Sequence, residues 1–317
     1  MGQRRLGQAS LAEALLPAGV GCNRRLERIA GLIDWAPLER LLAALRAPTG
    51  RPGYPPLALF RALLLAQWYQ LSDLGLEEAL ADRLSFRRFC GFGLDDGTPD
   101  ETTLCRFRGT LAEHGLSEAL FAEVNRQLDA RGLILKAGTL IDATLVEAAV
   151  ARPPVSEGEV STKDPEAGFT RRGRKSFFGF KAHVAVDLGS DLVREAILTG
   201  AEVGDSVVAD ALVQGDEAAV FMDKAYDSAP RRAALAEAGI ADGIMHRAHA
   251  RRLLAPWQRW MNRALAPIRG QVERAFGTLK RSYGWRRARY RGLARNGAHL
   301  HLLCTAMNLR RAERLVA

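Results

Sequence analysis

The chain has 317 residues and a formal net charge of +9, and 48% of its residues are hydrophobic, which is enough to bury one large core and a smaller one. It contains no run of eighteen apolar residues, and no hydrophobic segment follows the basic N-terminus, so we expect neither a membrane-spanning nor a secreted chain. The four cysteines are far apart and form no C-x-x-C pair, which predicts reduced thiols in a cytoplasmic protein.

The first third of the chain predicts helices and no convincing strand. Helices are expected over Leu38–Leu45, Pro56–Tyr69, Leu76–Leu84 and Thr102–His114. The last of these follows the capping pattern Thr98-Pro99-Asp100-Glu101. We therefore expect an α-helical N-terminal domain over residues 1–133.

The pattern changes to strands after residue 134. Thr139–Val146 has the length of a central strand, and Phe180–Val186 alternates, turns at Gly189-Ser190 and continues as Leu192–Leu198. With helices starting at Asp205 and Ser228, two further strands and a last helix, the expected order is β-β-β-α-β-α-β-α.

Two further predictions for this second region concern a loop and a histidine. Residues 151–176 are rich in Pro, Gly and charge and are predicted to form a mobile loop. His183 alternates onto the polar side of the hairpin, where we expect it to be exposed or to line a site.

Two aspartates interrupt or end apolar strands. A charge at Asp142 is costly inside a strand unless it is paired or binds a metal, although backbone donors could also hold it. Asp223 follows the run Ala218–Met222, at the strand end where open α/β sheets place ligands, although it could simply cap the turn before Tyr226.

A third acid stands alone in a basic stretch. Between Asp242 and Glu313 there are sixteen Lys and Arg residues and one acid, Glu273, whereas the rest of the chain is net negative. So local an excess of positive charge favours a binding face for a polyanion, of which DNA is the expected one.

The same acid lies in a patterned helix, expected to begin at Pro267. A core stripe is predicted at Val272, Phe276, Leu279 and Tyr283. Arg269, Glu273 and Lys280 follow the same spacing on an adjoining face. One helix can therefore direct a carboxylate and two cations at one region, although Glu273 could also merely pair with Lys280.

These residues resemble a family. Asp142 in Ile-Asp-Ala-Thr, Asp223 in Asp-Lys-Ala-Tyr-Asp, and Arg269-x3-Glu273-x6-Lys280 are similar to the three acidic motifs of bacterial insertion-sequence DDE transposases, in particular the insertion-sequence-five type. The resemblance covers most of the chain. One departure is Ala266, where the wider superfamily often has Tyr, which puts a tyrosine contact in doubt.

The resemblance implies an α/β, ribonuclease-H-like catalytic domain over residues 134–317, with a mixed sheet flanked by helices. Asp142, Asp223 and Glu273 would be the catalytic residues and the ligands of two Mg²⁺ ions, for which Mn²⁺ may substitute. The first step would expose a 3′-hydroxyl at a transposon end, and the second would join it to target DNA.

The resemblance also implies partners. These are double-stranded DNA, as transposon ends and target, and further copies of the chain in a homodimer or higher oligomer within a synaptic complex. The N-terminal domain would bind DNA and dimerise, and the protein would be associated with the bacterial nucleoid. Two alternatives stay open: an inactive DNA-binding repressor of the element, and a nuclease of the same fold without strand transfer.

Candidate DNA contacts come from both regions. They are Arg269, Lys280, Arg281, Trp285, Arg286, Arg287, Arg289, Lys175, Lys181, Arg106 and Arg108. The cations would neutralise phosphates, Trp285 would stack on unpaired bases, and the helix with Arg106 and Arg108 would enter a groove.

Overall fold

The computed structural model describes residues 6–7, 15–17, 19–45, 53–153, 161–248 and 253–317. It divides into two compact units: Met1–Ala130 together with His301–Ala317, and Arg131–Leu300. The predicted domains, 1–133 and 134–317, differ from these units mainly in the last helix, whose C-terminal part belongs to the first unit.

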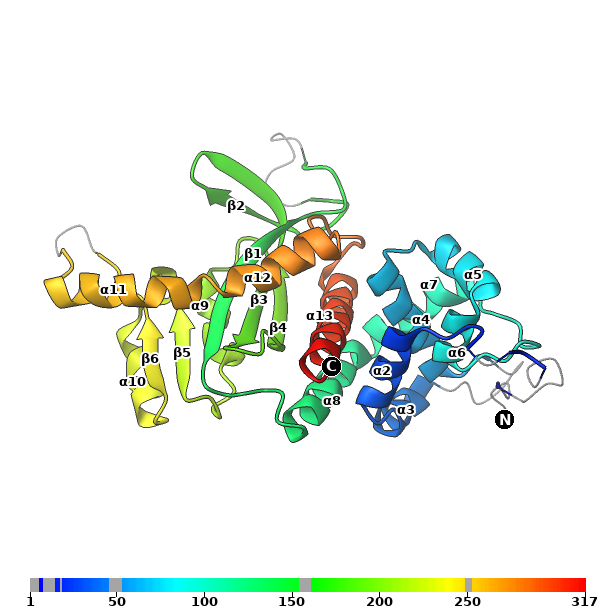
Figure 1. Cartoon of the computed structure of the whole chain (residues 1–317). Helices are drawn as coiled ribbons and strands as arrows, with labels where there is room; N and C mark the ends of the chain where they lie inside the picture. Colours follow the sequence, from blue (N-terminus) through cyan, green and yellow to red (C-terminus); the bar gives the residue numbers. More distant parts are fainter. Residues whose placement is uncertain (1–5, 8–14, 18, 46–52, 154–160, 249–252) are drawn as a thin grey trace. The chain divides into compact units, whose positions relative to one another are not determined.

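Helices make up the first unit (Figure 1). They are α2 (Arg24–Leu32), α3 (Ala36–Leu42) with η1 (Ala43–Leu45), α4 (Pro56–Tyr69), α5 (Asp73–Asp82), α6 (Leu84–Cys90), α7 (Glu101–Glu113), α8 (Leu116–Ala130) and the end of α13 (Leu293–Leu315). α4 is its central element, because most of its residues are buried. The Trp68 indole of α4 donates to the Ala306 carbonyl of α13 at 2.9 Å, so α13 contributes to this core.

All four helices predicted for this unit are present, and Leu38–Leu45 corresponds to α3 with η1. The prediction for Pro56–Tyr69 is confirmed at both ends, and α7 starts one residue before the predicted Thr102. The Asp100 side chain caps α7 by accepting from the Thr103 N–H at 2.6 Å. The predicted helix Leu76–Leu84 is wrong at its end, because Arg83 takes an extended conformation that separates α5 from α6. No helix among the described residues is long and apolar enough to cross a bilayer.

A six-stranded mixed sheet forms the second unit. Its strands are β1 (Thr139–Glu147), β2 (Gly168–Arg172), β3 (Lys175–Asp187), β4 (Val193–Gly200), β5 (Ala219–Met222) and β6 (Ala241–Ile244). β1 is central: it pairs antiparallel with β3 and parallel with β5, and β6 continues the parallel side. β4 pairs antiparallel with the C-terminal half of β3. This mixed sheet flanked by helices confirms the predicted fold class.

β2 and the first part of β3 form an arm that reaches beyond the sheet (Figure 1). The predicted loop over 151–176 is therefore wrong from Gly168 onward, whereas residues 154–160 of it lie outside the described residues. The turn is made at Gly173, whose φ of +62° suits glycine. Phe169 packs on Phe178 with ring centroids 4.8 Å apart, and this aromatic pair stabilises the hairpin.

Helical segments cover the sheet and carry its site. They are α9 (Asp205–Val208), η3 (Ala209–Leu212), η4 (Lys224–Tyr226), α10 (Ala229–Glu237), α11 (Pro256–Arg269), α12 (Val272–Gly277) and the π-helical η5 (Thr278–Ser282). Gly239 follows the end of α10 with φ +71°, the left-handed conformation in which many helices end. A buried apolar cluster, which includes Ile141, Val220 and Met222, packs beneath these segments.

The helix predicted to begin at Pro267 is wrong at its start. Pro267 lies inside the last turn of α11. This helix ends at Arg269, and α12 begins at Val272. The reason is that a proline removes one helical hydrogen bond, which weakens the end of a helix as readily as it suits a beginning. The core stripe is confirmed, because Val272, Phe276, Leu279 and Tyr283 are all buried.

Candidate active site

Strand pairing brings the two aspartates together. β1 and β5 are parallel, with Ile141 opposite Met222, so Asp142 and Asp223 follow paired residues on neighbouring strands. The Asp142 carboxylate accepts from the Ala143 N–H at 2.8 Å, and Asp223 accepts from the Lys224 N–H at the start of η4. Asp223 thus caps a turn and faces the site at once.

One guanidinium joins all three acids. Arg269 Nη1 lies 3.4 Å from the Asp142 carboxylate and 3.7 Å from the Asp223 carboxylate, while Nη2 lies 3.6 Å from the Glu273 carboxylate. Each distance is longer than a strong charge-assisted hydrogen bond. The three acids therefore converge on one cation without enclosing it tightly.

The convergence occurs in a cleft of about 470 Å³ within the second unit. Its lining includes the three acids, Arg269 and Phe276, together with Arg171 from the β2 arm. The buried stripe of α12 fixes which way this helix faces, because burying Val272 leaves Glu273 on the open side. Glu273 is the most exposed of the three acids, with 69% of its side chain accessible.

Lys280 is the second cation of the predicted face. Its ammonium donates to the Thr144 hydroxyl of β1, two residues beyond Asp142. Since alternate residues of a strand point to the same side, Lys280 stands beside the acids. Its place in the π-helical η5 fits the frequent occurrence of π-turns at functional sites.

Burial raises the pKa of Asp142 to about 6, and the nearby carboxylates of Asp223 and Asp205 add to the effect. The Ala143 N–H and the Arg269 guanidinium oppose it by favouring the charged form. The raised pKa shows that the ionised form of Asp142 is poorly stabilised in the cleft. A cation of higher charge than Arg269 would stabilise that ionised form.

A fourth acid, Asp205, lines the same cleft and was not among the predicted site residues. It stands at the start of α9, where its carboxylate lies 2.8 Å from the Lys181 ammonium. The same ammonium donates to the Val203 carbonyl at 2.6 Å. The predicted role of Lys181 as a phosphate contact is corrected, because the side chain is buried and engaged with Asp205. Its one signal in the sequence was its position at the predicted start of a helix, five residues after the end of β4.

Two polar side chains lie buried behind the acids. His183 is fully buried, and burial lowers its pKa to about 4, so the expectation of an exposed histidine is wrong. It faces Thr199, whose hydroxyl lies 3.0 Å from Nε2. The Tyr226 hydroxyl is buried without a hydrogen-bond partner among the described residues, and burial together with the charges of Asp142 and Asp205 raises its pKa.

The predicted stacking role of Trp285 is wrong. Only 2% of this residue is exposed, and its ring packs edge-on against His299 at 6.1 Å. The interleaved pattern of aromatics and cations suggested a surface, but Tyr283 and Trp285 alternate inward while Arg286 and Arg289 stay outside. A buried indole cannot stack on a base without leaving the core.

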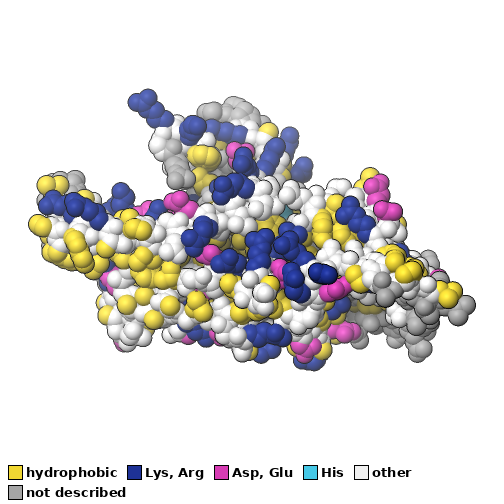
Figure 2. All heavy atoms as spheres, in the orientation of Figure 1, with side chains coloured by type: hydrophobic (Ala, Val, Ile, Leu, Met, Phe, Trp, Pro, Cys, Tyr) yellow, Lys and Arg dark blue, Asp and Glu magenta, His cyan; other side chains and the backbone are white. Residues whose placement is uncertain are grey.

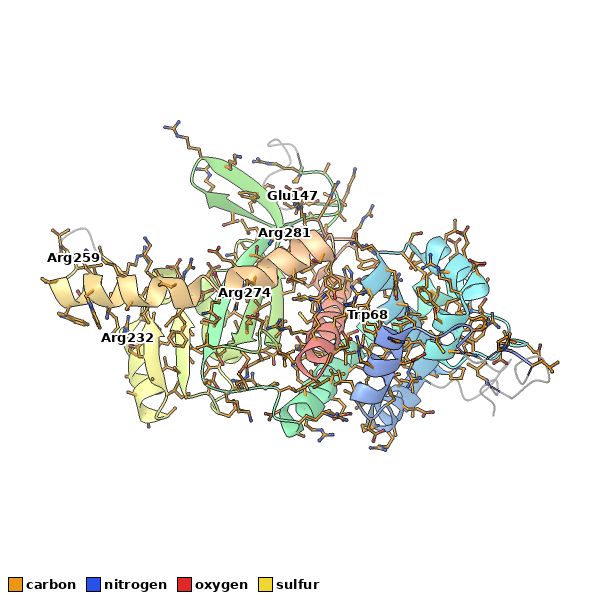
Figure 3. All side chains as sticks on the ribbon, viewed as in Figure 1. Trp68, Glu147, Arg232, Arg259, Arg274 and Arg281 are labelled. Carbon is orange, nitrogen blue, oxygen red and sulfur yellow. The ribbon has the colours of Figure 1, made fainter. Side chains whose placement is uncertain are left out.

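The cations predicted to contact DNA differ in whether their side chains are exposed or engaged in ion pairs. Lys175, Arg281, Arg286 and Arg289 are exposed, and Figure 2 shows Lys and Arg side chains on the arm and across the middle of the visible face. Figure 3 labels Arg281 in η5 and Arg274 in α12. In the first unit Arg106 is exposed, whereas Arg108 forms a two-pronged ion pair with Asp73.

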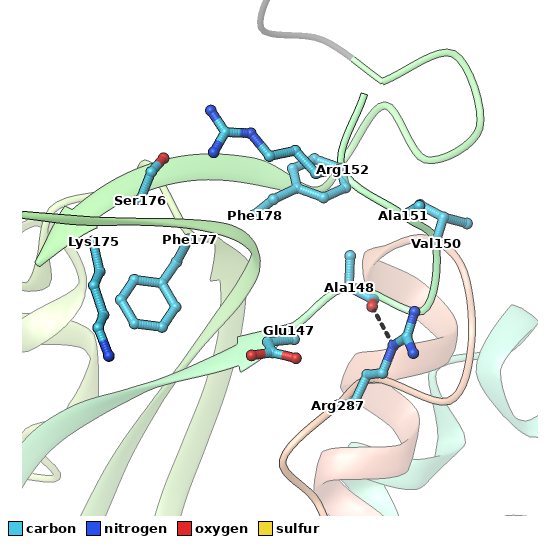
Figure 4. A pocket seen from close by; sticks show the side chains of 10 residues that line it. All are labelled: Glu147, Ala148, Val150, Ala151, Arg152, Lys175, Ser176, Phe177, Phe178 and Arg287. Carbon is cyan, nitrogen blue, oxygen red and sulfur yellow. Dashed lines mark hydrogen bonds between the residues drawn. The ribbon is translucent and has the colours of Figure 1, made fainter. Parts of the chain in front are cut away.

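Arg287 has a structural task beside a second hollow of about 680 Å³ (Figure 4). Its Nε donates to the Ala148 carbonyl and its Nη2 to the Ala149 carbonyl, both at 2.9 Å. The hollow is lined by Arg152, Lys175 and Phe177 as well. Arg287 thus ties the segment after β1 to the segment after η5.

The three cleft acids offer carboxylate oxygens as donors to a metal ion. Among the described residues, no three His, Cys, Asp or Glu side chains are arranged to hold a metal ion as they stand. In the cleft the cation that all three carboxylates face is the Arg269 guanidinium, which lies within 4 Å of each of them. The donors are all carboxylate oxygens facing one positive group, which is the ligand chemistry that Mg²⁺ and Mn²⁺ prefer. The residues therefore fit a hard divalent cation that takes the place of Arg269.

Comparisons with known proteins give two family matches and one structural similarity. Residues 135–309 match the family model described as transposase DDE domain, and residues 14–110 match the one described as transposase domain (DUF772). A cryo-EM structure of a piggyBac transposase synaptic complex with hairpin DNA is 11% identical in sequence, with a TM-score of 0.44. That similarity covers 93% of this chain and 73% of the piggyBac chain.

Proposed function

The chain belongs to the family of the transposase DDE domain, and from this premise we propose that Asp142, Asp223 and Glu273 are the acids that carry its polynucleotidyl transfer. The observation that carries the proposal is the convergence of these three carboxylates on the Arg269 guanidinium. They come from a central strand, a neighbouring strand end and a helix, so no local structural need explains their meeting.

We propose that the carboxylates of Asp142, Asp223 and Glu273 would hold two divalent ions. Such ions supply a deprotonated attacking oxygen and neutralise the charge on the leaving oxygen. Asp142 suits the binding of a cation because its raised pKa reflects a buried carboxylate whose negative charge is not fully balanced by Arg269.

The cations of the cleft would then bind substrate. Once the carboxylates are otherwise neutralised, Arg269 is released to contact the phosphate at the reacting bond, with its planar pair of donors matched to two oxygens. Lys280 holds β1 through Thr144 and adds a positive charge on the same side. The Asp205–Lys181 pair keeps the base of the cleft in shape.

The reaction we propose has two displacements at phosphorus. In the first, a water oxygen bonds to phosphorus and the bond to the 3′ oxygen of the transposon end breaks, leaving a 3′-hydroxyl. In the second, this hydroxyl attacks a target phosphodiester, and the displaced target oxygen leaves with a proton. No Ser or Tyr nucleophile is required in either step.

We also propose that the chain is of the insertion-sequence-five type and acts on the terminal inverted repeats of its own element. The spacing Arg269-x3-Glu273-x6-Lys280 and the short interval between Asp223 and Glu273 support this. We propose further that it works on double-stranded DNA as a homodimer or higher oligomer.

An end-cleavage and joining assay tests the proposal. Labelled duplexes that carry the DNA flanking the gene should be cut with a 3′-hydroxyl product and joined to a plasmid target in Mg²⁺ or Mn²⁺, and not in EDTA. Binding without cutting would favour the repressor, and cutting without joining would favour the nuclease. Cleavage that is undiminished in EDTA would reject the two-ion mechanism.

A further inference from the structure

Helix α11 leads into the candidate active site and carries an exposed face that the proposed mechanism does not use. Trp257 is 58% exposed and Trp260 is 66% exposed, although tryptophan is usually well covered. Leu253, just before the helix, is 85% exposed. Clustered exposed apolar groups of this size mark interaction surfaces.

Two arginines run beside the indoles. Arg259 and Arg263 are both exposed and stand four residues apart, so they form one row along the helix, while Trp257 and Trp260 form the adjoining row. Figure 2 shows the cations along one border of α11 with hydrophobic side chains beside them, and Figure 3 labels Arg259 at the far end. No acidic residue occurs between Leu253 and Val272 to neutralise this face.

The helix that carries this face is packed and hydrogen-bonded to the rest of the second unit. Leu265 on the opposite side of α11 is buried, and the Asn262 amide bonds to the His246 backbone twice, at 2.8 and 3.0 Å. Trp257 packs edge-on against the His246 ring with centroids 5.0 Å apart. The Trp257 indole and the helix that carries both indoles are thus positioned before any partner arrives, which lowers the entropy cost of binding.

We infer that this face, Trp257, Arg259, Trp260 and Arg263, binds single-stranded DNA. Parallel rows of cations and exposed rings are what an unpaired strand requires, because the cations follow the phosphates while the bases stack on the rings. A duplex would use only the cations, since its bases are already stacked. The face continues along the chain to Arg269 and Glu273, so the strand it takes is one unpaired near the reacting end.

The inference rests on the proposed function only in taking DNA as the ligand. A second copy of the chain is the competing occupant, because paired indoles also suit a protein interface. The charge favours DNA, since the same face would present Arg259 and Arg263 to their own copies across a two-fold axis, and like charges repel.

Binding of the full chain to three labelled probes tests the inference without cleavage. The probes are a mixed-sequence single strand, a blunt duplex, and the same duplex with one mismatched, splayed end. Replacing both indoles as W257L/W260L should weaken binding of the single strand and the splayed end by on the order of 10- to 100-fold. Binding of the blunt duplex should change by about threefold or less, because its affinity comes from phosphates.

Two further variants separate rings from other effects. W257F/W260F keeps the rings and should retain most of the affinity for the single strand, whereas the leucines keep apolar area alone. R259A/R263A should lower the salt slope for the single strand by about 0.7 for each lost phosphate contact. Leu74→Ala, at an exposed leucine of the other unit, is the control for removing surface apolar area.

Intrinsic fluorescence gives an independent reading, because Trp35, Trp68 and Trp285 are buried and only Trp257 and Trp260 are exposed. The single strand should quench the wild-type emission and leave that of W257F/W260F unchanged. Equal binding of all probes by wild type and W257L/W260L would overturn the inference. If that variant also sedimented as a smaller species, the face would be an interface between copies. If the wild-type protein showed these differences in binding between the probes but cleaved no transposon end, the result would count against the proposed function and not against this inference.

Discussion

Two arginines in the second unit meet acids in opposite ways. Arg231 is buried and its hydrogen bonds are short: 2.6 Å to Asp210, 2.6 Å to the Tyr226 carbonyl and 2.7 Å to the Ser206 carbonyl. Arg269 faces three acids, and its contacts with them are 3.4 to 3.7 Å long. A closed network holds the fold, whereas a loose one leaves charge available for a ligand. We expect the first to affect stability and the second to affect chemistry.

The largest expected effect is on cleavage by the acids around Arg269. Asp142→Asn, Asp223→Asn and Glu273→Gln each remove a charge and nearly preserve shape. Each should lower the rate of end cleavage by on the order of 10³-fold or more, since every 1.4 kcal/mol of lost transition-state stabilisation is about tenfold. DNA binding, measured by gel shift, should stay within a few-fold because phosphate contacts elsewhere supply it.

Asp210→Asn is the matched control from the closed network. It should keep near-normal cleavage, because Asp210 contacts Arg231 and not the cleft. The comparison fails if Asp210→Asn is as inactive as the cleft variants, or if one of the three cleft variants retains normal turnover.

The next effect is on stability, and its size differs between the two arginines. Arg231→Ala should lower the free energy of unfolding by on the order of 3 kcal/mol, because it leaves a buried carbonyl, a part-buried carbonyl and the Asp210 carboxylate without their donor. Arg269→Ala should lower it by about 1 kcal/mol or less, because its contacts are long and partly exposed. Thermal unfolding of the two variants measures the difference, and equal losses would mean that Arg269 is also structural.

A pH effect of smaller size follows from Asp142. Its folded pKa of about 6 is raised, so the stability associated with its protonated form is present at low pH and is lost as pH rises through about 6. Without metal, Asp142→Asn should therefore be more stable than wild type at pH 8, by on the order of 1–3 kcal/mol, and the difference should shrink towards pH 4. Denaturant unfolding at both pH values checks this. A variant less stable than wild type at pH 8 would contradict the burial of an uncompensated charge.

The smallest expected effect concerns exposed cations away from the cleft. Arg286→Ala with Arg289→Ala should lower the slope of log K against log salt on duplex DNA by about 0.9 for each lost phosphate contact. Arg287 is left in place because it holds two backbone carbonyls. An unchanged slope would mean that these side chains do not reach DNA.

Sequence patterns predicted the site residues whose positions follow from strand or helix periodicity. They failed for residues whose positions depend on tertiary packing. A charge in the middle of an apolar strand identified Asp142, and helical spacing placed Arg269 and Glu273 on one face. Periodicity could not reveal Asp205, because its relation to Lys181 depends on how α9 folds back onto β3. The sequence placed Arg286 and Arg289 correctly on the surface but gave Trp285 a stacking role there, whereas packing against His299 buries the indole.

The fold shows the same division. The central strand, the hairpin and the helix Pro56–Tyr69 were predictable from period and capping. The arm was not, because Gly and charge dominate its sequence, whereas the β2–β3 pairing and the contact of Phe169 with Phe178 stabilise it as strands. Pro267 was misplaced for a related reason: a proline suits the start of a helix, but it is also tolerated near an end.

Binding of Mn²⁺ at pH 8 in the presence of transposon-end DNA tests the central claim most directly, with electron paramagnetic resonance to count the ions bound. Wild-type protein should bind two ions per chain, as a two-ion phosphoryl transfer site requires. The combined variant Asp142→Asn, Asp223→Asn, Glu273→Gln should bind none at the same concentration and remain folded. Equal binding by the variant and the wild type would contradict the claim that these three acids around Arg269 form the metal site.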